Sequence, residues 1–139
     1  MKVLITGGAG FIGQRLARAL LQRGKLTAPD GAEAPIDEIL LYDVQVPAAR
    51  PDWADERVTL RAGDISDTAE VASLIDRDDI SVFHLASVVS GGGEMDFDLA
   101  MRVNLTGGLN VFEACRARAG QPRVVFASSI AVFGGSAMA

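Results

Sequence analysis

The sequence predicts an α/β fold, a doubly wound parallel sheet whose five strands lie in the order 3-2-1-4-5. Five short apolar runs alternate along the chain with segments whose apolar residues recur at helical spacing. The first apolar run passes into its helix through a glycine-rich loop. Parallel strands require crossover connections of this kind, and these are right-handed. We therefore expect one domain over residues 1–139, with ligands bound outside the carboxyl ends of the strands, where the first and fourth strands part.

The first strand is predicted at Val3–Ile5, and the loop after it has the spacing G-x-x-G-x-x-G at Gly7, Gly10 and Gly13. We expect Gly7 to permit a tight turn, Gly10 to let the backbone approach a ligand, and Gly13 to let helix and strand pack closely. The helix that follows offers unpaired N–H groups and the positive end of its dipole, which suit a pyrophosphate. The alternative is an ordinary glycine-rich turn, but strand, turn and helix fall in the order that dinucleotide binding requires.

The chain up to the third strand is predicted to contain one helix and two irregular stretches. The helix runs from about Phe11 to Arg23 and ends at Gly24, which suits a C-cap. Lys25–Asp37 is polar and contains two prolines, so we expect a surface loop. The second strand is Ile39–Tyr42. Val46–Asp55 also contains two prolines and cannot be regular throughout.

The later strands are predicted at 57–62, 80–86 and 123–127, each apolar and bounded by polar or glycine residues. Between the first two of them, Asp67 or Ser66 can cap a helix, because a short polar side chain there accepts from the free N–H groups of the first turn. The apolar residues of that helix are Val71, Leu74 and Ile75.

A long helix is predicted from about Asp96 to Arg118, after a loop at Gly91–Gly93. Gly107 and Gly108 inside it each cost roughly 1 kcal/mol relative to Ala, which indicates that this helix packs closely on a neighbour. Its apolar stripe, with Asn104 on the same side near the sheet, is Phe97, Met101, Leu105, Leu109 and Phe112.

Composition and charge do not favour several classes of partner. The net charge of −5 and the pI of about 4.7 do not favour binding to a nucleic acid or an anionic membrane. The apolar runs fall short of the roughly 20 residues of a membrane span and of a signal peptide. A single cysteine, Cys115, fits a reducing compartment, so we expect the protein in the cytoplasm.

Two acidic residues at strand ends are candidates for nucleotide recognition. Asp43 could accept hydrogen bonds from both ribose hydroxyls of an adenosine and would repel a 2′-phosphate, which favours NAD over NADP. It lies further past Gly13 than the usual 20 or so residues, and the Lys25–Asp37 loop accounts for the excess. Asp64 could accept from an adenine amino group while Ile65 covers the ring. The alternatives are a solvated aspartate at Asp43 and a charge at a helix N-terminus at Asp64.

The carboxyl ends of the fourth and fifth strands supply the other candidates. His84, the only histidine, lies in an apolar strand and is interpreted as a packed core residue rather than a base. Leu85–Val89 leaves that strand at the switch point, so its backbone can line a cleft, and Asn104 needs buried partners there. Ser128 and Ser129 end the fifth strand, where a hydroxyl could bind a substrate or satisfy backbone groups. The sequence offers no spacing of metal ligands.

Together these residues resemble the extended short-chain dehydrogenase/reductase family, the NAD-dependent epimerase/dehydratases with a Rossmann-type fold. The resemblance covers the whole chain, and the loop Lys25–Asp37 and the run Val88–Asn104 are similar to members that oxidise a small sugar acid such as D-erythronate. Its marks are Thr6–Gly13, Asp43, Gly63–Ile65, His84–Ala86, Asn104 with Gly107, and Val125–Gly134.

The resemblance implies roles by position. Ser129 matches the catalytic Ser/Thr of the family, which orients the substrate hydroxyl and stabilises its developing charge. Phe133 stands where many members have Tyr, a change that we expect to matter little. Cofactor contacts are implied for Gly7, Gly10, Phe11, Ile12, Gly13, Asp43, Asp64, Ile65, Leu85, Ala86, Ser87 and Asn104.

One departure from the family pattern stands out. The family's general base is a Tyr whose pKa is lowered by a Lys four residues later, and both follow the serine strand. Here the only tyrosine is Tyr42 and the only lysines are Lys2 and Lys25, all upstream of that strand. We therefore expect this chain to be the amino-terminal part of a longer enzyme, inactive alone and lacking the later strands and the substrate-binding region. The resemblance also implies a homodimer when complete.

Three functional hypotheses stay open. In the first, NAD accepts a hydride from a hydroxyl-bearing carbon of a sugar acid, sugar or nucleotide sugar, with oxidation of a small sugar acid favoured over epimerisation or dehydration. In the second, the chain is a non-catalytic NAD-binding module. A mononucleotide or flavin binder is the third, and Asp43 together with Gly63–Ile65 disfavours it.

Overall fold

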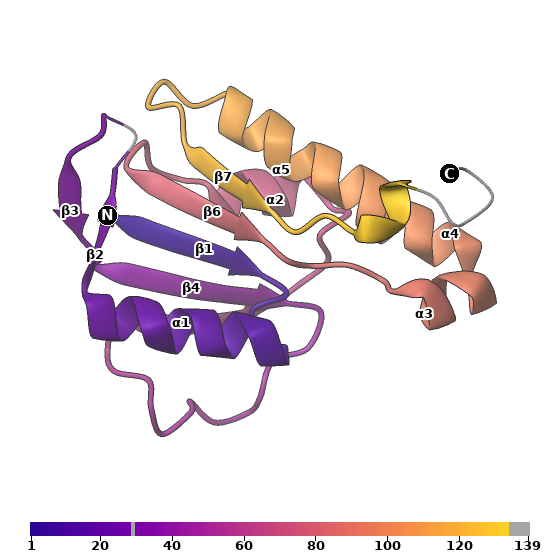
Figure 1. The fold of residues 1–139 in the computed structure, drawn as a ribbon, viewed down its shortest axis with the longest axis horizontal. Coiled ribbons are helices and arrows are strands. Elements are labelled where there is room, and N and C mark those ends of the chain that lie inside the picture. The colour runs from indigo at the N-terminus through magenta and orange to yellow at the C-terminus, as the bar shows by residue number, and fades with distance from the viewer. Residues whose placement is uncertain (29, 134–139) are drawn as a thin grey trace.

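The computed structural model describes residues 1–28 and 30–133 of the chain. Five parallel strands form one sheet in the order β5-β4-β1-β6-β7, which is the predicted 3-2-1-4-5 arrangement (Figure 1). The strands are β1 Lys2–Thr6, β4 Glu38–Asp43, β5 Val58–Ala62, β6 Ile80–His84 and β7 Arg123–Phe126.

The register of the central strands brings their carboxyl ends to one edge. Thr6 at the end of β1 pairs with Tyr42 of β4 on one side and with His84 of β6 on the other. The core of β1 is completely buried, as expected for a strand covered on both faces. The loops that leave β1, β4 and β6 therefore begin side by side, and the site is built from them.

Helices cover both faces of the sheet (Figure 1). Helix α1 (Phe11–Arg23) packs Ala17 and Leu20 against one face, and it ends at Gly24 in the left-handed conformation, as predicted. Helices α2 (Thr68–Leu74) and α5 (Gly107–Arg116) cover the other face. The N-cap of α2 is Asp67, whose side chain accepts from the backbone N–H of Glu70, so the alternative cap Ser66 is wrong.

The prediction of a surface loop at Lys25–Asp37 is wrong in part. Strands β2 (Lys25–Thr27) and β3 (Glu33–Pro35) pair in an antiparallel hairpin apart from the main sheet. Leu26 and Ala34 face each other in this pair and pack against the core under α1. Two strands too short to show alternation of polarity leave little sequence signal, and Pro29 lies outside the described residues.

The prediction of one long helix from Asp96 to Arg118 also needs correction. The structure has α3 (Ser90–Met95), α4 (Phe97–Ala100), a π-helix η1 (Met101–Thr106) and then α5, and the expected loop Gly91–Gly93 lies inside α3. The predicted apolar stripe points outward rather than onto the sheet, and the buried face of α5 is formed instead by residues that include Gly107, Val111 and Cys115. The stripe residues Phe97, Met101, Leu105, Leu109 and Phe112 are between 41% and 69% exposed.

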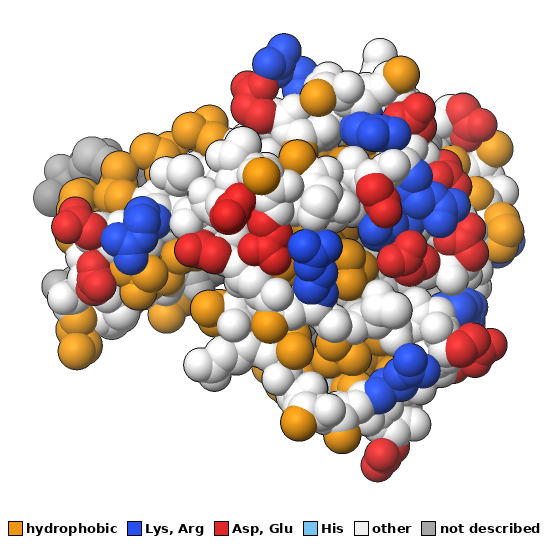
Figure 2. All heavy atoms as spheres, turned by 180° about the vertical axis from the view of Figure 1, so that it is seen from behind, with side chains coloured by type: hydrophobic (Ala, Val, Ile, Leu, Met, Phe, Trp, Pro, Cys, Tyr) orange, Lys and Arg blue, Asp and Glu red, His pale blue; other side chains and the backbone are white. Residues whose placement is uncertain are grey.

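Acidic and basic side chains are intermixed over the face of the molecule that Figure 2 shows. None of the helices in the described part of the chain combines the length and the apolar character needed to cross a bilayer.

Candidate cofactor site

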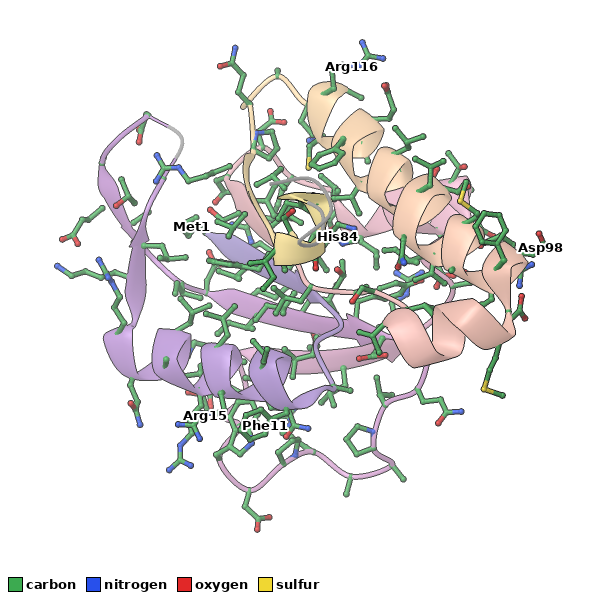
Figure 3. All side chains as sticks on the ribbon, turned by 45° about the vertical axis from the view of Figure 1, so that its right-hand side comes forward. Met1, Phe11, Arg15, His84, Asp98 and Arg116 are labelled. Atoms are coloured by element: carbon green, nitrogen blue, oxygen red, sulfur yellow. The ribbon has the colours of Figure 1, made fainter. Side chains whose placement is uncertain are left out.

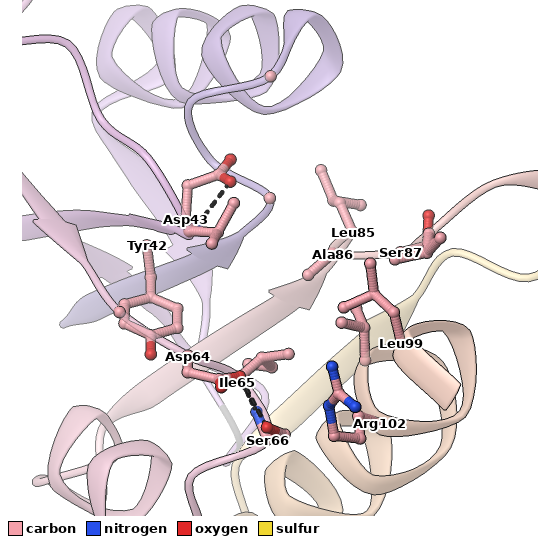
Figure 4. Close-up of a pocket in the computed structure, with 16 residues that line it drawn as sticks. Tyr42, Asp43, Asp64, Ile65, Ser66, Leu85, Ala86, Ser87, Leu99 and Arg102 are labelled. Carbon is pink, nitrogen blue, oxygen red and sulfur yellow. Dashed lines mark hydrogen bonds between the residues drawn. The ribbon is translucent and has the colours of Figure 1, made fainter. Parts of the chain in front are cut away.

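A cavity of about 520 Å³ opens at the carboxyl edge of the sheet (Figure 4). Its walls come from the glycine loop after β1, the end of β4, the turn after β5, the segment after β6, and the helices α4 and η1. The lining residues are Gly7, Gly10, Tyr42, Asp43, Val44, Gly63, Asp64, Ile65, Ser66, Leu85, Ala86, Ser87, Val88, Leu99, Arg102 and Val103.

The glycine loop is held by close backbone contacts. Gly7 has a φ of +68°, and a Cβ there would lie 2.9 Å from the backbone nitrogen of Ala86. A Cβ at Gly13 would lie 2.5 Å from the carbonyl oxygen of Gly7, so Gly13 packs on the loop itself as much as on a strand. At Gly10 the nearest atom would be the Gly7 oxygen at 3.3 Å, and Gly10 faces the cavity. The loop thus leaves one glycine open to a ligand.

Sequence reasoning missed Gly8. A Cβ at this position would lie 2.7 Å from the carbonyl oxygen of Ile5 and 2.8 Å from the Cα of Leu41. The side chain is therefore excluded by two strands rather than by a ligand. The double glycine at Gly7 and Gly8 was the available signal.

The start of α1 is free to bind an anion. The N-cap Gly10 provides no side-chain cap, and the first turn contains no acidic residue. Within the described chain, the backbone N–H groups of Phe11, Ile12 and Gly13 have no hydrogen-bond acceptor. The side chains of Phe11 and Ile12 are 77% and 68% exposed, and Phe11 lies under the guanidinium of Arg15 on the outer side of α1 (Figure 3). Any contact of these two residues with a ligand would therefore be through the backbone.

Asp43 joins the end of β4 to the glycine loop. Its Oδ2 accepts from the backbone N–H of Ala9 at 3.1 Å, and its Oδ1 accepts from that of Val44 at 2.8 Å. An ionised carboxylate has about four acceptor sites, so two remain for ribose hydroxyls. The contact with Ala9 also means that Asp43 orients the loop on which a pyrophosphate would lie.

Asp64 and Ile65 follow β5 and line the opposite side of the cavity. The Asp64 Oδ1 accepts from the backbone N–H of Ser66 at 2.9 Å and from its hydroxyl at 2.8 Å, and these bonds hold the pKa of Asp64 below its usual value. The carboxylate of Glu70 fixes the turn from the other side, because it accepts from the backbone N–H of Asp64 at 3.2 Å. Ile65 is buried against Gly107. A Cβ added at Gly107 would lie 2.7 Å from the Cγ2 of Ile65.

Tyr42 is a cavity residue that the sequence did not single out. Its ring lines the cavity, yet the side chain is almost completely buried, and its hydroxyl has no hydrogen-bond partner among the described residues. Burial and the neighbouring carboxylate of Glu70 raise the pKa of Tyr42 well above its ordinary value. The only tyrosine of this chain is therefore unsuited to act as a base near neutral pH.

The segment after β6 is held to β1 by Thr6. Its Oγ1 accepts from the backbone N–H groups of Leu85 and Ala86 at 3.2 Å and lies 2.6 Å from the Nδ1 of His84. With those two bonds accepted, the hydroxyl proton is directed at the ring nitrogen. Burial lowers the pKa of His84, which lies between the sheet and α5 (Figure 3). The expectation that His84 is a hydrogen-bonded core residue is confirmed.

Asn104 and Ser129 do not line the cavity. Asn104 lies in η1 on the exposed side rather than near the sheet, and its amide pairs with the backbone of Val88, accepting at 2.8 Å and donating at 2.9 Å. It therefore positions a lining residue. Ser129 lies beyond β7 at the same edge of the sheet, where the backbone N–H of Ala127 still bonds to the carbonyl of His84. The structure describes no side chain for Phe133, and Gly134, the last residue of the predicted motif, lies outside the described residues.

These features fit a dinucleotide. An uncapped helix start, a glycine open to the cavity and a carboxylate with spare acceptors lie along one side of it, and an apolar pocket with Asp64 lies on the other. Within residues 1–28 and 30–133, no group of three or more His, Cys, Asp or Glu side chains is arranged to hold a metal ion.

The sequence profile described as the NAD dependent epimerase/dehydratase family matches residues 3–138. The D-erythronate dehydrogenase of Cupriavidus necator is 53% identical over 135 residues, which make up 97% of this chain and 40% of that protein.

Two solved structures are also similar. A nucleoside-diphosphate-sugar epimerase from Agrobacterium tumefaciens is 40% identical with a TM-score of 0.82, over 98% of this chain and 39% of that one. The UDP-glucose 4-epimerase of Thermus thermophilus in complex with NAD is 34% identical with a TM-score of 0.68, over 93% of this chain and 38% of that one. The chain thus spans about two fifths of the length of the relatives it matches.

Proposed function

The chain belongs to the NAD-dependent epimerase/dehydratase family, and on that premise we propose that it forms the NAD-binding part of a dehydrogenase that oxidises a small sugar acid. The observation that carries the proposal is the cavity at the strand switch point, where the glycine loop, Asp43 and Asp64–Ile65 converge. A solved relative of the same fold, 34% identical to this chain, is a complex with NAD.

Each part of the site has a distinct task in this proposal. The N–H groups at the start of α1 bind the pyrophosphate, since they are unpaired and lie at the positive end of the helix dipole. Asp43 accepts from the hydroxyls of the adenosine ribose and disfavours a 2′-phosphate by like charge. The free oxygen of Asp64 accepts from the adenine amino group, and Ile65 covers the ring. The backbone of Leu85–Ser87, held by Thr6, lines the nicotinamide side.

Bound NAD would supply the acceptor for the hydride that leaves the hydroxyl-bearing carbon of the substrate. The hydroxyl proton must then pass to a base, and Tyr42 is unsuited to that role because its hydroxyl is buried with a raised pKa. The 139 residues contain no Tyr-x-x-x-Lys sequence, so we assign the base to the complete protein. Ser129 would hydrogen-bond the substrate hydroxyl and stabilise its developing charge.

The substrate class rests on the 53% identity to a D-erythronate dehydrogenase. A nucleotide-sugar epimerase or dehydratase is the second candidate, favoured by the epimerase from Agrobacterium tumefaciens with its TM-score of 0.82. The two differ in what happens to the hydride. A dehydrogenase releases reduced cofactor, whereas an epimerase returns the hydride to the sugar and shows no net reduction.

The test combines measurements of cofactor binding and of substrate turnover, both made on the complete protein. Calorimetry should show NAD bound in preference to NADP, and D-erythronate should then produce NADH, seen as absorbance at about 340 nm. Binding of NAD without reduction by D-erythronate, together with epimerisation of a nucleotide sugar, would favour the second candidate. Binding of NAD with neither reaction would leave a non-catalytic module. Failure of a folded chain to bind either dinucleotide would overturn the proposal.

The expectations of a homodimer and of a cytoplasmic location stay predictions. The outward apolar stripe of η1 and α5 is compatible with a subunit contact. Sedimentation of the full chain would test the first expectation.

A further inference from the structure

Helices α4 and η1 place three side chains in the cavity that the sequence did not indicate. Leu99, Arg102 and Val103 all line it, and they come from α4 and η1. The backbone N–H of Gly107 donates to the carbonyl oxygen of Arg102, five residues earlier, as a π-helix requires. Arg102 and Gly107 therefore lie on one side of the helix, which is the side next to Ile65.

The position of this wall is fixed from two sides. Gly107 contacts Ile65 so closely that no Cβ fits between them. On the exposed side of η1, Asn104 makes two hydrogen bonds to the backbone of Val88. Arg102 thus projects into the cavity from a helix that is anchored to both neighbouring loops (Figure 4).

The charge of Arg102 has no ion-pair partner among the side chains that the structure describes. Arg15, Arg18, Arg50 and Arg123 likewise form no ion pair with a described side chain, but Arg102 is the one of these five that lines the cavity. The positive charge of Arg102 acts on the carboxylate of Asp64 and helps to lower the pKa of Asp64. Since only the Oδ1 of Asp64 is engaged, by Ser66, its other oxygen is open to a ligand in the described structure.

We propose that Arg102 forms the second wall of the adenine subsite, with its guanidinium over the face of the base opposite Ile65. The inference rests on the proposed function, because it requires NAD as the ligand. Ile65 from the turn after β5 and Arg102 from η1 would hold the two faces, and Asp64 would bind the amino edge. A planar guanidinium suits this place, since it stacks on a base and attracts its π-electrons, and the apolar neighbours Leu99 and Val103 strengthen that attraction.

The experiment compares three variants of the full chain by calorimetry with NAD. Arg102→Met keeps the length of the side chain and removes the guanidinium, so NAD should bind about 3- to 30-fold more weakly. Arg102→Lys keeps the charge without the plane, and should recover less than half of that loss in free energy. The matched control is Arg116→Met at the last turn of α5, which is paired with Glu113 and does not line the cavity. It should bind NAD as the unmodified chain does.

Two further readouts separate stacking from other ways in which Arg102 could act on NAD. Nicotinamide hypoxanthine dinucleotide keeps the ring faces and the pyrophosphate but lacks the amino group, so under stacking Arg102→Met should weaken its binding by the same factor as that of NAD, whereas a role exerted through Asp64 and the amino group would make the factor smaller. The factor should also persist between about 50 mM and 500 mM salt, whereas attraction at a distance is screened. A factor that vanishes at high salt, or a Lys variant equal to the original, would overturn the stacking role. Unchanged binding in Arg102→Met would do the same, while an unmodified chain that binds no NAD would defeat the proposed function instead.

Discussion

The two sides of the cavity are built in different ways. On the side of β1 and α1, the wall is backbone: glycine Cα atoms lie against the carbonyls and strands beside them, under a core that is fully buried. On the side of α4, η1 and α5, the wall is made of side chains from a helix whose outer apolar stripe is exposed. The first side is fixed by close packing of backbone on backbone, which leaves no room for a Cβ atom at Gly7, Gly8 or Gly13. The second is held on its inner face by the packing of Val111 and Cys115 in the core and by the contact of Gly107 with Ile65, and further by hydrogen bonds from Asn110 to Ile65 and between Asn104 and Val88.

This difference teaches where each kind of substitution should act. Changes on the backbone side should disturb folding and binding together, because there is no room for adjustment. Changes on the helical side should alter affinity more than stability, because a helix with a free outer face can shift.

Gly7→Ala should cause the greatest loss of stability. It forces Ala into a φ of +68° and places its Cβ 2.9 Å from the backbone nitrogen of Ala86, so we expect a loss of about 3 kcal/mol in the free energy of unfolding. Urea denaturation of the full chain measures this. The control is Gly10→Ala, whose Cβ meets only the Gly7 oxygen at 3.3 Å. Gly10→Ala should lower the free energy of unfolding by less than about 1 kcal/mol, and it should weaken the binding of NAD at least tenfold. Equal stabilities for the two variants would contradict the contrast.

Asp43→Asn should change cofactor selectivity, because Asp43 joins the backbone side to the ribose. Removing the charge should raise the dissociation constant for NAD by about 10- to 100-fold, since hydrogen bonds to an ionised group contribute about 1.5–3 kcal/mol. NADP should be much less affected, so the ratio of the two dissociation constants should narrow. The control Asp67→Asn keeps an N-cap side chain on α2 and should leave both constants unchanged. A preserved ratio in Asp43→Asn would show that another group excludes NADP.

Gly107→Ala tests the helical side directly. Its Cβ would lie 2.7 Å from the Cγ2 of Ile65, so the isoleucine must move toward the adenine position. We expect NAD to bind about tenfold more weakly, with stability changed by less than about 1.5 kcal/mol because the gain in helix propensity offsets part of the overpacking.

Gly108→Ala is the matched control for that substitution. Its Cβ would meet His84 Nε2 at an ordinary 3.7 Å, so it should keep NAD affinity and gain up to about 1 kcal/mol. If both alanines had the same effect on affinity, the contact of Gly107 with Ile65 would not shape the site.

His84 lies between the two sides and should make a smaller, pH-dependent contribution. Burial lowers its pKa, so below the unfolded value of about 6.5 the unfolded chain binds more protons than the folded one. Its stability contribution is therefore complete above that pH and falls as the pH drops toward the folded pKa, by at most about 1.4 kcal/mol per pH unit. Urea midpoints at pH 7.5 and 5.5 should show the fall. In His84→Gln the difference should largely disappear, and an unchanged slope would locate the titration elsewhere.

The sequence carried enough information to predict the backbone side and not the helical one. The order of the strands follows from alternating apolar runs, and Gly7–Gly13 follows from a spacing that the turn itself demands. The helical wall was not predicted, because Arg102 was not singled out and Asn104 was expected near the sheet, whereas η1 is a π-helix with Asn104 on its exposed side. The π-helix has no clear signature in the residues Met101–Thr106, and the hydrogen bonds of its Asn104 to Val88 join residues far apart in the sequence.

The extra residue that a π-turn carries has a consequence for how this segment can change over generations. Insertions and deletions usually accumulate in loops, but here a helix already accommodates the equivalent of one inserted residue. Deleting one residue from Met101–Thr106 would keep the composition of the helix nearly intact and yet rotate everything before it by roughly 100° relative to α5. Arg102 would then leave the cavity although no cavity residue had been replaced. We therefore expect a relative that is one residue shorter in this helix to have a different side chain at this wall.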